Sequence, residues 1–217
     1  PAFRDGPGFN AWIRELIQTN VVYLMASTFS DHMMPYFTLP FILDNDALAR
    51  QFLQEIYGVT ITTNHVFWTP ERLADDDVLN KIKNVLGYRA TVLDQMEHHF
   101  TWFGRSAALG DDGYRINRIN GVETFAINNG ASDFRFTTTD NGLGLSMRAL
   151  FNRKARGAQD QVITWFGNWE EYSDTAKATA YDRNIRWIAN RPWIQIVALE
   201  QILRGEVDAS ADGTGDN

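Results

Sequence analysis

Apolar β-like runs alternate with amphipathic helical segments along the first half of this chain, and this alternation constrains the fold more than any other feature. The β-like runs span 21–28, 63–70 and 88–94, and the helical segments span 9–18, 41–58 and 71–86. A strand–helix alternation of this kind is typical of a parallel sheet whose functional residues gather at the carboxyl ends of the strands. The sequence therefore predicts an α/β fold with mostly parallel strands.

The second half of the chain departs from this regular plan. Residues 111–140 are rich in Gly, Asn and Thr with alternating polar and apolar positions, which indicates short strands or hairpins inserted into the α/β fold. A further apolar strand is expected at 161–172, and helices are expected at 143–154, 173–189 and 192–203, the last with Pro192 at its start. We therefore expect one folded domain over 1–204, followed by an acidic, Gly-rich segment over 205–217.

Local signals suggest where several of these helices begin and end. Asn45 or Asp46 is a candidate N-cap, and Gly58 and Gly87 stand where helices should terminate. Glu71 directly follows Pro70, so it is expected in the first turn of the helix at 71–86.

Composition excludes several classes of function. The formal net charge is -7 and the chain has no basic run, so we expect no nucleic-acid partner. No apolar stretch reaches the roughly 20 residues that a membrane-spanning helix needs. The chain has no cysteine, which excludes disulfides and thiolate metal sites. Because it opens on Pro1 without an initiator Met, we expect it to be part of a longer chain.

Four apolar runs end in polar or ionisable residues. The residues at these ends are Asp31 and His32, then Glu71, then Asp94 with Glu97, His98 and His99 close behind, and finally Asn168, Trp169, Glu170 and Glu171. In a parallel sheet these ends converge on one rim, where two carboxylates can perform glycoside hydrolysis. Neighbouring aromatic residues such as Trp68, Trp102 and Trp169 could stack on sugar rings and raise the pKa of one carboxyl group by desolvation.

Each of these residues also has a purely structural interpretation. Glu71 after Pro70 suits a first-turn carboxylate that is stabilised by the helix dipole. Asp94 could cap the helix that follows its strand, and Asp75, Asp76 and Asp77 read as a solvated helix face. His98 and His99 are adjacent in sequence, so their side chains would point in different directions.

Taken together, the four segments resemble glycoside hydrolase family 57, whose members act on α-glucans and share an incomplete (β/α)7 barrel. "STFSDHMMPYF" is similar to the family's second motif, with His32 and Pro35 in the matching places. "FWTPERL" is similar to the third motif, and the resemblance makes Glu71 the nucleophile. "GYRATVLDQMEHHF" is similar to the fourth motif, and the resemblance makes Asp94 the acid/base. "VITWFGNWEEYSD" is similar to the fifth motif, with Trp169 and Glu170 at an aromatic and a glutamate position.

The resemblance covers about residues 20–200 and implies both a mechanism and a set of substrate contacts. It implies retaining cleavage or transfer of α-glucosidic linkages, with the Glu71 and Asp94 carboxyl groups about 5–5.5 Å apart and no cofactor for catalysis. It implies substrate contacts from His32, Trp68, His98, His99, Trp169 and Glu170. Two departures stand out: the family's first motif is absent, and Asn168 replaces the aspartate that is usual in the fifth.

The final stretch "DASADGTGDN" has a pattern of its own. Asp208, Ser210, Asp212 and Asp216 fit the first part of a calcium-binding loop, and the stretch resembles a thrombospondin type 3 repeat. A flexible acidic linker explains the same composition. The calcium hypothesis predicts a structural calcium ion and a secreted or cell-surface parent protein.

Three functions remain open at this point. The first is a family 57-type domain that acts on a polysaccharide or oligosaccharide. The second is a catalytically inactive glycan-binding or structural module of a large surface protein, in keeping with the two departures. The third is a metal-dependent polysaccharide deacetylase, suggested by "TFSD" at a strand end, with its metal on Asp31 and histidines. A sheet edge left open by the missing strand would also allow a homodimer.

Overall fold

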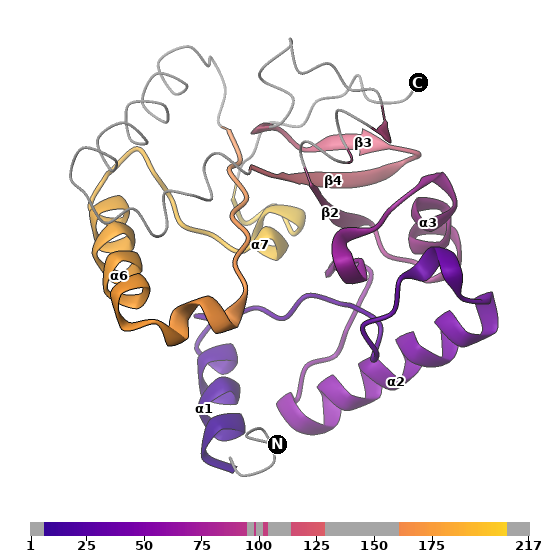
Figure 1. Cartoon of the computed structure of the whole chain (residues 1–217), viewed down its shortest axis with the longest axis horizontal. Coiled ribbons are helices and arrows are strands. Elements are labelled where there is room, and N and C mark those ends of the chain that lie inside the picture. Colours follow the sequence, from indigo (N-terminus) through magenta and orange to yellow (C-terminus); the bar gives the residue numbers. More distant parts are fainter. Residues whose placement is uncertain (1–6, 95–97, 99–101, 104–113, 129–160, 208–217) are drawn as a thin grey trace.

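The computed structural model describes residues 7–94, 98, 102–103, 114–128 and 161–207 (Figure 1). The α-helices are α1 (Pro7–Gln18), α2 (Leu39–Tyr57), α3 (Asp76–Asn80), α6 (Thr175–Ala189) and α7 (Leu199–Leu203). The strands are β1 (Val66–Phe67), β2 (Ala90–Asp94), β3 (Asn117–Ile119) and β4 (Val122–Ile127). Short helical turns are η2 (Met34–Tyr36), η3 (Pro70–Arg72), η4 (Lys81–Val85) and η9 (Trp169–Ser173).

The four strands form one mostly parallel sheet in the order β1-β2-β4-β3. β1, β2 and β4 run parallel, and only β3 is antiparallel to its neighbour β4. Two isolated parallel bridges extend the sheet, Ala26 beside Phe67 on one side and Thr164 beside Ile127 on the other. The predicted α/β class with mostly parallel strands is confirmed, and the arrangement is consistent with a partial (β/α) barrel.

Three predicted elements differ in detail from the structure. The predicted strands at 21–28 and 161–172 contribute one bridging residue each, Ala26 and Thr164. The β region expected from residue 111 onward starts as the β3–β4 hairpin, but β4 pairs along its length with β2 and so belongs to the main sheet. The part of that region beyond residue 128, and the helix expected at 143–154, lie outside the described residues.

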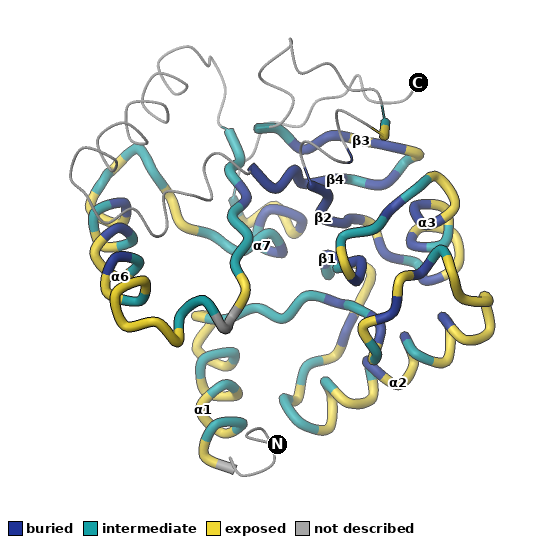
Figure 2. Tube along the Cα trace, in the orientation of Figure 1, coloured by how far each residue is buried: buried dark blue, intermediate teal, exposed yellow. Residues whose placement is uncertain are grey.

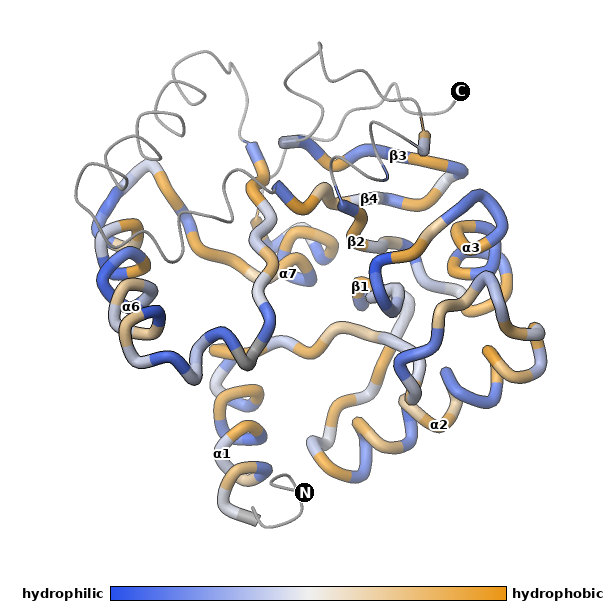
Figure 3. Tube along the Cα trace, viewed as in Figure 1, coloured by the Kyte–Doolittle hydropathy of each residue, from blue (hydrophilic) through white to orange (hydrophobic). Residues whose placement is uncertain are grey.

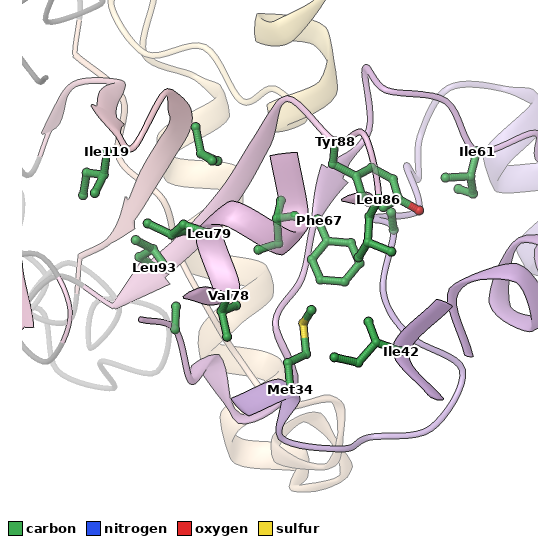
Figure 4. Packing of buried hydrophobic residues seen from close by; sticks show 14 residues of the cluster. Met34, Ile42, Ile61, Phe67, Val78, Leu79, Leu86, Tyr88, Leu93 and Ile119 are labelled. Carbon is green, nitrogen blue, oxygen red and sulfur yellow. The ribbon is translucent and has the colours of Figure 1, made fainter. Parts of the chain in front are cut away.

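The two faces of the sheet are both apolar and pack against different helices. On one face Phe67 and Leu93 pack with Met34 of η2, Ile42 of α2, and Val78 and Leu79 of α3 (Figure 4). On the other face Val66, Ala90 and Val92 pack with Ile202 and Leu203 of α7. Because side chains alternate along a strand, Asp94 lies on the second face, two residues beyond Val92. Figure 2 shows β2 buried along its length between these layers.

α2 alternates hydrophobic and hydrophilic residues (Figure 3), and its Ile42 joins the core on the first face of the sheet. It begins at Leu39 after the N-cap Thr38, so the predicted cap at Asn45 or Asp46 was wrong. Asn45 instead accepts a hydrogen bond from the Ser30 hydroxyl at 2.7 Å. Gly58 ends the helix in the left-handed conformation, as predicted.

The segment predicted as one helix at 71–86 is broken into three parts. Residues Pro70–Arg72 form a separate turn, α3 begins only at Asp76, and the π-helix η4 follows it. Asp75 is the N-cap of α3, because its carboxylate accepts a hydrogen bond from the Val78 N–H at 2.8 Å. Glu71 is therefore not a first-turn residue of that helix. The predicted helix at 192–203 is likewise shortened to α7, and no helix in the described residues is long and apolar enough to cross a membrane.

Glu200 links α7 to the start of β1, and its carboxyl group makes the stability of the fold depend on pH. Glu200 is only 4 % exposed, and its carboxylate accepts a hydrogen bond from the Val66 N–H at 3.4 Å. Burial raises the pKa of Glu200 above its ordinary value of 4.5, against smaller opposing contributions from hydrogen bonds and from Arg204. A carboxyl group whose pKa is raised by folding destabilises the folded state once the pH rises above its ordinary pKa of 4.5.

We therefore expect Glu200→Gln to be more stable than the wild type at pH 7, because the neutral amide still accepts from Val66 without a buried charge. At pH 4 the difference should vanish, because both folded and unfolded wild-type chains are then mostly protonated at this position. Urea unfolding at the two pH values measures the difference. Glu206→Gln, at an exposed position, is the control and should show no such gain. A Glu200→Gln protein that is less stable at both pH values would contradict the expectation.

Candidate active site at the strand ends

The turn that carries Glu71 directly follows β1 and has an unusual backbone. Glu71 has φ 53° and Arg72 has φ 56°, so two consecutive residues with side chains adopt the left-handed conformation. Such residues cost roughly 1–2 kcal/mol each, and they concentrate at functional sites. The Glu71 side chain is exposed, and within the described residues its carboxylate has no hydrogen bond or ion pair. The fold thus presents a carboxylate at the end of β1 in place of the helical turn predicted from sequence.

Asp94 is the last residue of β2 and is held in the interior of the protein. It is only 3 % exposed. Its Oδ2 lies 3.4 Å from Nη1 of Arg72, and its backbone N–H donates to Nδ1 of His98 at 3.1 Å. His98 is itself buried. Asp94 therefore contacts His98, another predicted site residue, and Arg72, which belongs to the turn that bears Glu71.

Arg72 and Phe166 also belong to the candidate site, although no role was predicted for either. The guanidinium carbon of Arg72 lies 5.0 Å from the centre of the Phe166 ring. Trp68 stacks on the same ring, with the centroids 5.2 Å apart and the planes at 9°. We name Trp68, Arg72, Asp94 and Phe166 the strand-end cluster. For Arg72 and Phe166 the sequence signals are only an arginine directly after Glu71 and an aromatic residue in the apolar run at 161–172.

His32 lies in an aromatic setting after the bridge at Ala26. Its ring contacts Phe37 and Phe41 edge-on at centroid distances of 4.8 and 5.0 Å. Its Nδ1 lies 3.0 Å from the Ser30 hydroxyl, whereas its buried Nε2 has no hydrogen-bond partner in the described residues. No contact joins His32 to the strand-end cluster in the described part of the chain, so its substrate contact stays a prediction.

The structure describes the other predicted site residues only in part or not at all. Trp169 and Glu170 form the start of η9, but their side chains lie outside the described part. His99, Asp208, Ser210, Asp212 and Asp216 also lie outside it. Their predicted roles, including the calcium site, stay predictions.

A cavity of about 870 Å³ adjoins the strand-end cluster. Its lining includes Trp68, Val92, Ile127, Phe166, Trp193 and Glu200. Val92 and Trp68 place it on the same face of the sheet as Asp94, although neither Asp94 nor Glu71 lines it. The volume is within the usual range for small-molecule sites, and the lining combines aromatic and aliphatic residues with a few polar groups.

The described residues contain no group of three or more histidine and carboxylate side chains that could hold a metal ion. The deacetylase hypothesis, which needs such a group at Asp31, gains no support from this part of the chain.

The fold has clear counterparts among solved structures. The match to 4-α-glucanotransferase from Thermococcus litoralis has a TM-score of 0.67 at 13% identity, covering 96% of this chain and 30% of that chain. The match to a GH57-type branching enzyme from Pyrococcus horikoshii has a TM-score of 0.63 at 12% identity and covers 94% and 48%. The match to the α-amylase AmyC from Thermotoga maritima has a TM-score of 0.66 at 10% identity and covers 97% and 54%.

No family model matches the sequence, and no curated protein matches it. The chain spans between about a third and about a half of the length of the three solved structures. At 10–13% identity the similarity concerns the fold and not the activity of these enzymes. The chain therefore shares its α/β fold with a 4-α-glucanotransferase, a GH57-type branching enzyme and an α-amylase.

Proposed function

We propose that this chain is a carbohydrate-active domain that hydrolyses or transfers α-glucosidic linkages of a polysaccharide or oligosaccharide with retention of configuration. Glu71 is the nucleophile and Asp94 is the acid/base. The observation that carries the proposal is the strained turn after β1, which presents Glu71 while its neighbour Arg72 contacts Asp94 at the end of β2. Strain of this kind points to a functional constraint, because a solvated helix-start glutamate would need none.

The two carboxyl groups divide the chemistry between them. Asp94 gives its proton to the glycosidic oxygen while a Glu71 oxygen attacks the anomeric carbon, so the glycosidic C–O bond breaks and a glycosyl–Glu71 ester forms. Water or a sugar hydroxyl then attacks the same carbon, Asp94 takes its proton, and Glu71 leaves as a carboxylate. Water as the acceptor gives hydrolysis, and a sugar hydroxyl gives transfer.

The surroundings of Asp94 and Trp68 suit a sugar substrate. Asp94 is buried, so water is scarce around it and proton transfer to a bound oxygen is favoured. The adjoining cavity offers the faces of aromatic side chains, which pack against the apolar faces of sugar rings. His32, His98 and the side chains of Trp169 and Glu170 are our candidates for further substrate contacts.

The direct test is to incubate the chain with amylose and maltooligosaccharides and to follow the products by NMR. We expect α-configured reducing ends or α-linked transfer products to form first, because two inversions at the anomeric carbon retain configuration. First formation of the β-anomer would contradict the assignment of Glu71 as nucleophile. Binding on a glycan array without turnover would instead identify an inactive glycan-binding module. Release of acetate from an acetylated polysaccharide would support the deacetylase.

A further inference from the structure

Among the described residues, Arg72 contacts both Asp94 and Phe166 of the strand-end cluster. It belongs to the turn after β1, its Nη1 lies 3.4 Å from the Asp94 carboxylate at the end of β2, and its guanidinium lies over Phe166. Its side chain is 38% exposed, whereas that of Asp94 is 5% exposed. The ion pair therefore lies at the boundary between solvent and the interior, where a charge pair is only partly screened.

The backbone of Arg72 shares the strain of the Glu71 turn. Within the turn, the Arg72 N–H donates to the Thr69 carbonyl at 2.8 Å and the Leu73 N–H donates to the Pro70 carbonyl at 3.3 Å. These two bonds close the turn but do not attach it to the neighbouring strand. The side-chain contacts of Arg72 with Asp94 and Phe166 supply that attachment, across 22 and 94 positions of sequence. A planar guanidinium that is always charged can make an ion pair and lie on an aromatic ring at the same time.

We propose that Arg72 is a positioning residue for the reaction assigned above, and this inference rests on that proposed function. It holds the Asp94 carboxylate from one side, while the bond between the Asp94 N–H and His98 holds the backbone of the same residue. Through its own backbone it also fixes the turn that presents Glu71. The nucleophile and the acid/base thus keep a constant relative position, because one residue is attached to both.

The test compares kcat and KM for maltooligosaccharides between the wild type and two variants. Arg72→Leu keeps an apolar stem beside Phe166 but loses the ion pair, and we expect kcat to fall by about 100-fold with KM changed less than about threefold. Arg72→Lys keeps the positive charge near Asp94 but loses the planar contact with the ring, and we expect it to recover about tenfold of that loss. A merely structural role would alter the thermal midpoint without this separation of kcat from KM and without rescue by lysine.

Arg89→Leu is the matched control. Arg89 pairs with Glu123 at 2.9 Å, but it precedes β2 and so lies at the opposite end of that strand from Asp94. We expect its kcat to stay at the wild-type value.

The outcomes separate the two proposals. A wild type without turnover would overturn the proposed function, and this inference with it. Wild-type turnover combined with an unchanged kcat in Arg72→Leu would overturn only the role of Arg72. If Arg72→Leu does not fold, Arg72→Lys decides: a kcat about tenfold below wild type at an unchanged thermal midpoint supports the role, and a wild-type kcat overturns it.

Discussion

Glu71→Gln is expected to lower turnover of α-glucans by at least about 10⁴-fold, because an amide oxygen cannot form the covalent glycosyl intermediate. Binding of maltooligosaccharides should remain close to that of the wild type, since glutamine has nearly the same shape and adopts the same backbone conformation at the same cost. Calorimetric binding and reducing-end assays on the same preparation measure the two properties separately. Full turnover in Glu71→Gln would rule out Glu71 as the nucleophile.

Glu71→Gly provides a second test of Glu71 as the nucleophile. Glycine adopts positive φ without steric cost, so the variant should be as stable as the wild type or more stable by up to about 1 kcal/mol. Azide can enter the space left by the side chain and attack the anomeric carbon while Asp94 protonates the leaving oxygen. The product should then be a glycosyl azide of inverted configuration, because only one displacement occurs. Asp77→Asn, which alters an exposed carboxylate on α3 paired with Lys81, should leave turnover unchanged.

Asp46→Ala is expected to destabilise the fold by about 3 kcal/mol, the largest effect on stability that we anticipate. The Asp46 carboxylate is 7 % exposed and accepts hydrogen bonds from the Tyr88 hydroxyl at 2.6 Å and from Nε of Arg50 at 2.7 Å. Arg50 also donates to the carbonyls of Ile61 and Leu86, and its guanidinium lies 4.6 Å from the centre of the Tyr88 ring. Removing the carboxylate leaves a buried phenol and a partly buried cation without their shared acceptor.

The same network affects the ionisation of Tyr88. Burial, followed by the hydrogen bond to Asp46, raises the pKa of the Tyr88 phenol above its ordinary value.

Asp182→Ala on α6 is the matched control for Asp46→Ala, because Asp182 and Arg186 form an i,i+4 pair of the same kind with both side chains well exposed. It should leave the free energy of unfolding nearly unchanged. Equal effects of the two substitutions would show that burial of the Asp46 network contributes nothing.

Local sequence signals located most of the elements that position the site. The apolar run that ends at Asp94 is strand β2, and Gly58 and Gly87 both have the left-handed conformation expected where helices end. These predictions succeed because strand alternation, helix periodicity and glycine conformation depend on residues close together in the chain. The α/β class with mostly parallel strands follows from the same alternation.

The predictions that failed concern residues whose partners are distant in sequence. Asn45 satisfies the local rule for an N-cap, but its amide oxygen binds Ser30 and α2 begins six residues earlier, at Leu39. Glu71 satisfies the local rule for a first helical turn, but it lies in a strained turn beside Arg72, whose side chain contacts Asp94 and Phe166. In both cases the local capping or first-turn preference, worth about 1 kcal/mol, does not decide the backbone conformation.

The sequence by itself determined that Glu71 and Asp94 stand at the ends of neighbouring β-like runs, since apolar alternation and the following polar residues are local properties. Only the tertiary structure decided how those ends are connected. Arg72 reaches Asp94 and Phe166 because parallel pairing of β1 with β2 brings their carboxyl ends together, and because the run at 161–168 lies beside Ile127 at the carboxyl end of β4. Such contacts depend on the order of the strands in the sheet, which the side-chain periodicity along one strand does not encode.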